Sequence, residues 1–81
     1  MDNFKVMLSS IDEVKEFVRI ANLFEQDIDL VSGRYVVDAK SIMGIFSLDL
    51  SKPILVEVHS DHSDALREKM DSFILKPPTD D

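Results

Sequence analysis

The chain has 81 residues, which is enough for one hydrophobic core but not for two. Its 16 acidic and 9 basic residues give a net charge of −7, which opposes binding to nucleic acid or to an anionic membrane surface. There is no cysteine, so disulfides, thiolate catalysis and cysteine zinc sites are excluded. No apolar run approaches the ~20 residues that span a bilayer, and the N-terminus lacks signal-peptide features. We expect a cytoplasmic domain that needs no cofactor and binds other proteins.

The first element predicted is a strand, because Phe4, Val6 and Leu8 alternate with residues of the opposite face. A helix follows, opened by a capping box in which Ser10 accepts the amide of Glu13 and the Glu13 carboxylate bonds the amide of Ser10. We expect this helix to end near Glu25. Its apolar stripe has helical spacing and consists of Val14, Phe17, Val18, Ala21 and Phe24.

A β-hairpin is predicted next, with Ile28 and Leu30 on one face and Ser32-Gly33 at the turn. Tyr35 and Val37 belong to the returning strand. A shorter helix then covers Ser41–Leu48, with Ser41 as its N-cap. Gly44 inside it costs about 1 kcal/mol relative to alanine, so this helix depends on tertiary support.

Pro53 marks the entry to a fourth strand, whose inward side chains are Ile54, Val56 and Val58. Ser60 or Asp61 is expected to cap a last helix, which Pro77-Pro78 stops. The apolar stripe of this helix is Leu66, Met70, Phe73 and Ile74. The order βαββαβα predicts an α+β open-faced sandwich, an antiparallel sheet with helices on one face. We expect residues 1–76 to form the domain and residues 77–81 a flexible acidic tail.

Residues 39–48, with the sequence AKSIMGIFSL, resemble the regulatory-serine helix of HPr, the phosphocarrier of the bacterial sugar phosphotransferase system. The resemblance extends to residues 18–24 of the first helix and to the order of elements along nearly the whole chain. It implies a four-stranded antiparallel sheet with strand order 1-4-2-3, covered by three helices.

The same resemblance puts Ser10 where the family has its phosphorylated histidine, Asp12 where it has an arginine and Glu13 where it has a proline. Phosphoryl transfer needs an imidazole nucleophile and cationic or amide groups that stabilise the moving phosphate. Asp12 and Glu13 would instead repel a phosphate. We therefore predict a protein without catalytic residues, neither a histidine phosphocarrier nor an enzyme, in which Ser10 serves as a helix cap.

Ser41 is the predicted phosphorylation site. In the Gram-positive branch that this segment resembles, the equivalent serine is phosphorylated by an ATP-dependent HPr kinase/phosphorylase. The modified protein then binds a transcription regulator of carbon catabolite control. A phosphate at a helix N-cap meets unpaired amides, so the fold would tolerate it. The residues alone leave an ordinary N-cap as the alternative.

Ile42, Met43 and Phe46, with Lys40 beside them, are the predicted partner-binding residues, because the family presents an apolar patch on this helix. Periodicity alone favours core positions for such a cluster. Ile45 and Leu48 are expected to face inward, which leaves Met43 and Phe46 as the clearest candidates for contact with a partner.

Two alternatives stay open. His59 and His62, near Asp61 and Asp64, could act as displaced phosphocarrier histidines or as metal ligands, but the pattern is weak and favours surface histidines tuned by neighbouring carboxylates. We predict no metal site. The apolar residues of the second helix could also pair two copies, so a monomer or a weak dimer is expected.

Overall fold

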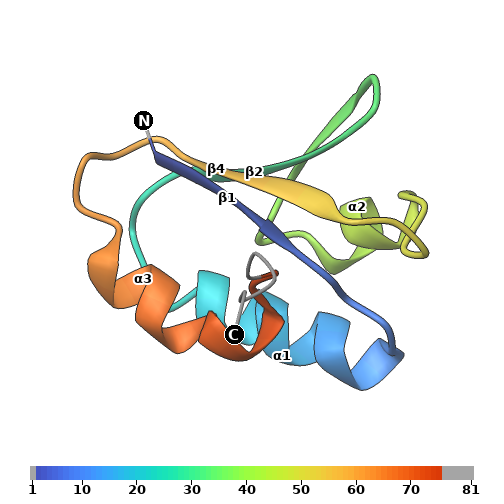
Figure 1. Cartoon of the computed structure of the whole chain (residues 1–81), viewed down its shortest axis with the longest axis horizontal. Coiled ribbons are helices and arrows are strands. Elements are labelled where there is room, and N and C mark those ends of the chain that lie inside the picture. Colours follow the sequence, from blue (N-terminus) through green and yellow to red (C-terminus); the bar gives the residue numbers. More distant parts are fainter. Residues whose placement is uncertain (1, 76–81) are drawn as a thin grey trace, which may run out of the picture.

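The computed structural model describes residues 2–75 as a four-stranded antiparallel sheet with helices packed against one face (Figure 1). The strand order is β1-β4-β2-β3, as the resemblance predicts. In chain order the elements are β1 (Asp2–Val6), α1 (Ile11–Ala21), β2 (Ile28–Ser32), β3 (Tyr35–Asp38), α2 (Ile42–Phe46), β4 (Ile54–Val58), α3 (Asp64–Lys69) and a 3-10 turn, η1 (Asp71–Phe73).

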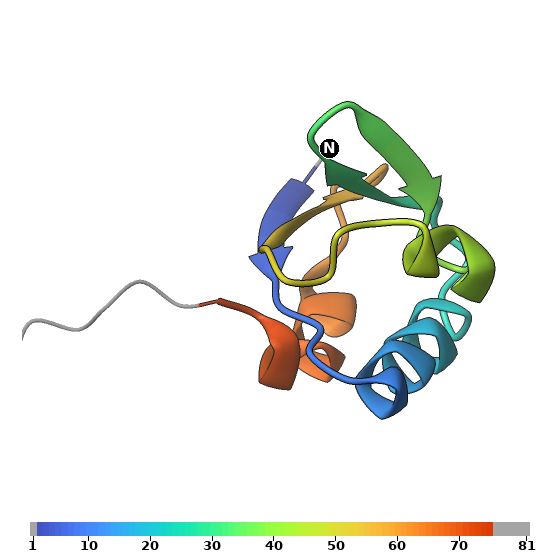
Figure 2. The same cartoon turned by 90° about the vertical axis from the view of Figure 1, so that its right-hand side faces the viewer.

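The core lies between the sheet and the helices, and the predicted alternation of the strands is confirmed. Phe4 and Val6 of β1 are buried, whereas Asn3 and Lys5 on the other face are exposed. The inward residues of the two central strands are also buried: Ile28, Leu30, Ile54, Val56 and Val58. Buried residues of α1, α2 and α3 complete the core on the helical side of the sheet, among them Phe17, Ile20, Ile45 and Leu66. Among residues 2–75, no helix lies on the opposite face of the sheet (Figures 1 and 2).

Helix α1 begins as predicted but ends earlier. The Ser10 hydroxyl accepts the amide of Glu13 at 3.1 Å. The Glu13 carboxylate, however, accepts the amide and hydroxyl of Ser9 rather than the amide of Ser10, so the reciprocal half of the capping box is shifted by one residue. The helix stops at Ala21 and not near Glu25, because the Asn22 side chain bonds the carbonyl of Val18 at 2.9 Å and closes the last turn.

Tight backbone packing explains the glycine in α2. A Cβ added to Gly44 would lie 3.2 Å from Cβ of Val37 in β3, which is closer than ordinary packing allows. The glycine therefore lets this helix approach the sheet, at the cost in helix propensity noted above. The helix has five residues and ends at Phe46, not at Leu48 as predicted. Gly33 has φ of 60° and forms the predicted turn between β2 and β3.

The last helix differs most from expectation. It starts at Asp64 after Ser63, and neither Ser60 nor Asp61 is its cap. The Ser63 hydroxyl donates a hydrogen bond to the carboxylate of Asp2 at the start of β1, and it does not cap α3. The helix ends at Lys69, before the prolines, because the chain turns through η1 and then pairs with β1. Residues 77–81, predicted to be a tail, lie outside the described residues.

Candidate functional site

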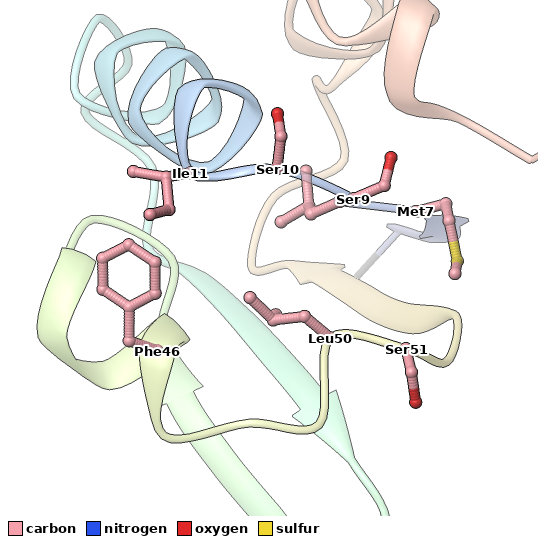
Figure 3. A pocket seen from close by; sticks show the side chains of 8 residues that line it. Met7, Ser9, Ser10, Ile11, Phe46, Leu50 and Ser51 are labelled. Carbon is pink, nitrogen blue, oxygen red and sulfur yellow. The ribbon is translucent and has the colours of Figure 1, made fainter.

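An apolar hollow of about 540 Å³ lies between the start of α1, the end of α2 and the loop that precedes β4 (Figure 3). The residues that line it are Met7, Leu8, Ser9, Ser10, Ile11, Phe46, Leu50 and Ser51. Ile11 points toward the ring of Phe46 across the hollow. No lining residue carries a charge or an imidazole, so the hollow suits an apolar side chain and not a phosphate.

Hydrogen bonds fix the first turn of α1 above this hollow. Ser10 caps the helix, and its hydroxyl points away from Phe46 in Figure 3. Glu13 accepts the Ser9 amide at 2.7 Å and the Ser9 hydroxyl at 2.8 Å. These two bonds, the amide first, hold the pKa of Glu13 below its usual value. A carboxylate that stays ionised here opposes the approach of phosphate.

Both histidines lie at the other end of the domain from Ser10. His59 directly follows β4, whose last residue, Val58, pairs with Asp2 at the start of β1. Ser10 instead follows the end of β1. The carbonyl of His62 accepts the side chain of Gln26, beyond the C-terminus of α1, whereas Ser10 precedes its N-terminus. Neither imidazole is therefore folded over the opening turn of α1.

His59 is paired with a carboxylate. Its Nε2 lies 2.8 Å from Oδ2 of Asp29, on the outer face of the sheet. A shallow depression beside it is lined by Asp27, Ile28, Asp29, Asp38 and His59. Even so, no three His, Asp or Glu side chains in residues 2–75 converge in a way that could hold a metal ion.

The predicted partner-binding residues divide into exposed and anchored side chains. Met43 is 76% exposed and Phe46 is 42% exposed, although both are large and apolar. Ile42 is half-buried and packs against the core. The Lys40 ammonium donates to the carbonyl of Phe24 at 2.7 Å, which joins the segment before α2 to the loop after α1. Met43 and Phe46 are thus the members of the set most available to a partner.

Ser41 is exposed and caps α2. Its hydroxyl accepts the amide of Gly44 at 3.2 Å. The side chain therefore combines solvent access with a backbone donor that a phosphate oxygen can use in place of the hydroxyl oxygen. The geometry is compatible with modification.

Sequence reasoning missed Ile11 and Leu50 as part of this surface. Ile11 is 62% exposed, and its apolar character within a polar capping segment was the available signal. Leu50 lacks such a signal, because a turn after α2 positions it. In that turn Asp49 accepts the hydroxyl of Ser51 at 2.5 Å and its amide at 3.1 Å, and these bonds lower the pKa of Asp49.

The family model for the PTS HPr component phosphorylation site matches residues 13–74. The chain belongs to the HPr family. The match begins at Glu13 and so does not include Ser10 or Asp12. HPr proteins are phosphocarriers and not catalysts, so this chain belongs to a family of carrier proteins.

Solved structures share the fold of this chain. HPr-C-His from Thermoanaerobacter tengcongensis is similar with a TM-score of 0.75 and 23% identity, over 89% of each chain. The phosphocarrier protein HPr from Bacillus anthracis str. Ames has a TM-score of 0.71 and 25% identity, over 91% of this chain and 96% of that one. The histidine-containing phosphocarrier of a mycoplasma has a TM-score of 0.72 at 13% identity, over 88% and 89%. A search of curated proteins finds no significant match.

Within residues 2–75, no helix has the length and apolar character needed to cross a membrane.

Proposed function

We propose that this HPr-family protein is a docking module of the sugar phosphotransferase system and not a histidine phosphocarrier. The observation that carries the proposal is the apolar hollow beside Ser10, where neither an imidazole nor a guanidinium is present among the lining residues. Exposed Met43 and Phe46 extend this apolar surface along α2. A partner protein would place an apolar side chain between Ile11 and Phe46 and cover α2. The proposal places the protein in the cytoplasm.

The partner proposed is an HPr kinase/phosphorylase, with Ser41 as its substrate. Ser41 is exposed, and its Gly44 contact offers an amide to the phosphate that would be attached. Added negative charge beside Met43 would then alter which proteins bind α2. A carbon-control transcription regulator is the second partner considered, although Asp12 stands where the family resemblance places an arginine.

Incubation with an HPr kinase and ATP, followed by mass spectrometry of the intact protein and its fragments, tests this proposal. One added phosphate on Ser41 is expected, and Ser41→Ala should abolish it. Ser47→Ala is the matched control, because Ser47 lies at the other end of α2 and bonds the carbonyl of Gly44. Absence of phosphate on Ser41 would refute the switch. Unchanged kinase binding by Phe46→Ser would refute docking through α2.

One observation favours a second candidate, a displaced phosphocarrier. The contact of Asp29 with Nε2 of His59 is the type of arrangement that orients a nucleophilic imidazole. Against it, Asp27, Asp29 and Asp38 line the adjacent depression and would repel a phosphoryl donor. Phosphorylation with phosphoenolpyruvate and enzyme I that disappears in His59→Ala would establish this candidate.

A further inference from the structure

The open face of the sheet carries two ordered rows of side chains that the proposed function does not use. The antiparallel register sets Val36, Val31 and Leu55 directly side by side across β3, β2 and β4. The next outward positions along the same strands are Asp38, Asp29 and Glu57, which are also direct cross-strand neighbours. An apolar row therefore runs beside an acidic row, two residues apart along each strand.

The apolar row is accessible. Val36 is 60% exposed, and Val31 and Leu55 are only partly buried, although they lie in the middle of the sheet. Helices α1, α2 and α3 do not reach this face (Figure 2). Neighbouring apolar side chains in water favour a partner that covers them.

The acidic row determines the chemistry of that partner. Like charges directly opposite each other in a sheet are unfavourable, and Asp29 has such a neighbour on each side. At the β1 edge the two rows end in Lys5, opposite Leu55, and in Asn3, opposite Glu57. His59 contacts Asp29. Within residues 2–75, Asp29 is the only one of the three carboxylates that forms an ion pair, with His59, so the face stays complementary to cations.

We propose that this face binds a lysine- or arginine-rich amphipathic segment of a partner protein. Its apolar side chains would cover the row of Val36, Val31 and Leu55, and its cations would lie over Asp38, Asp29 and Glu57. A second copy of this chain fits less well, because each copy carries a net charge of −7.

A synthetic amphipathic peptide of leucine and lysine is the probe, titrated into isotope-labelled full-length protein and followed by NMR shifts. Shifts are expected in β2, β3 and β4. Glu57→Lys should weaken binding about tenfold or more, whereas Glu68→Lys, the same charge change on α3, should weaken it by less than about twofold. Val36→Ser should weaken binding, and Leu23→Ser, an exposed apolar residue after α1, should not.

A second peptide with glutamine in place of leucine separates recognition from simple charge attraction. Weaker binding of that peptide is expected, because the apolar row then has nothing to contact. Equal effects of Glu57→Lys and Glu68→Lys would overturn the proposal. So would shifts confined to the hollow near Phe46, or sedimentation that shows two copies joined through Val36. Unfolding curves of each variant confirm that its fold is intact.

Discussion

Ser10 occupies a position with two competing uses. As an N-cap it needs its oxygen to accept the Glu13 amide, whereas as a nucleophile it would need that oxygen free and a base beside it. The structure shows the cap, with the oxygen 3.1 Å from the Glu13 amide. Ser9 and Glu13 reinforce the same turn. At the scale of the residue, the Ser10 oxygen is therefore engaged in capping α1.

This assignment predicts the effect of removing the hydroxyl. Ser10→Ala should lower the free energy of unfolding by about 1 kcal/mol, because the first turn of α1 loses its cap. Ser9→Ala should have a smaller effect, since the Ser9 amide keeps its bond to Glu13. Urea unfolding followed by circular dichroism measures both. Equal stability of Ser10→Ala and the parent protein would contradict the capping role.

At the scale of elements, the contact between β1 and α3 joins the two ends of the described chain. Asp2 accepts the Ser63 hydroxyl and lies 3.4 Å from Nη1 of Arg67. The Ser63 bond, and then the charge of Arg67, lower the pKa of Asp2 from its ordinary value of 3.8. Arg67 also lies over the ring of Phe4, 5.1 Å from its centre. Charge and packing thus act together at this contact.

The lowered pKa of Asp2 gives this contact a defined pH dependence. The ionised carboxylate is favoured in the folded state, so its stabilisation is complete above about pH 5 and is lost as the pH falls through the folded pKa. The difference in unfolding free energy between the parent and Asp2→Asn should be constant from about pH 5 upward and shrink below about pH 4. Ser63→Ala should remove part of this dependence. A difference that does not change with pH would contradict the account.

The elements differ in how well sequence predicts them. The alternation of apolar and polar residues correctly predicted where each strand lies, because burial of one face of a strand imposes a period of two. The ends of α1 and α3 were predicted less well, because long-range contacts decide them. The Asn22 side chain closes α1, and pairing of residues 74–75 with β1 draws the chain away from a longer α3. No local pattern reports such contacts.

The candidate site was predicted in part for the same reason. Resemblance pointed to Met43 and Phe46, and both are exposed. The hollow itself could not be anticipated, because three separate segments bring Ile11, Phe46 and Leu50 together. The roles of Ser41, Lys40 and the rest of the predicted set stay predictions until partners are tested.

At the scale of the whole molecule, the distribution of negative charge determines which partner proteins are favoured. The net charge of −7 and the carboxylates at the start of α1 disfavour an acidic partner at the hollow. The open sheet face adds a second acidic surface with its own apolar row. The apolar hollow with α2 and the open face of the sheet are therefore two separate candidate binding surfaces on one small domain.

The central claim is that the hollow at the start of α1 has lost phosphocarrier chemistry. Incubation of the parent protein with phosphoenolpyruvate and enzyme I, followed by phosphorus NMR, tests it most directly. The double variant Ser10→His with Asp12→Arg, which restores an imidazole and a cation at that turn, is the control that should gain acid-labile phosphate. We predict no phosphohistidine signal from the parent protein. A stoichiometric acid-labile signal from the parent would contradict the account.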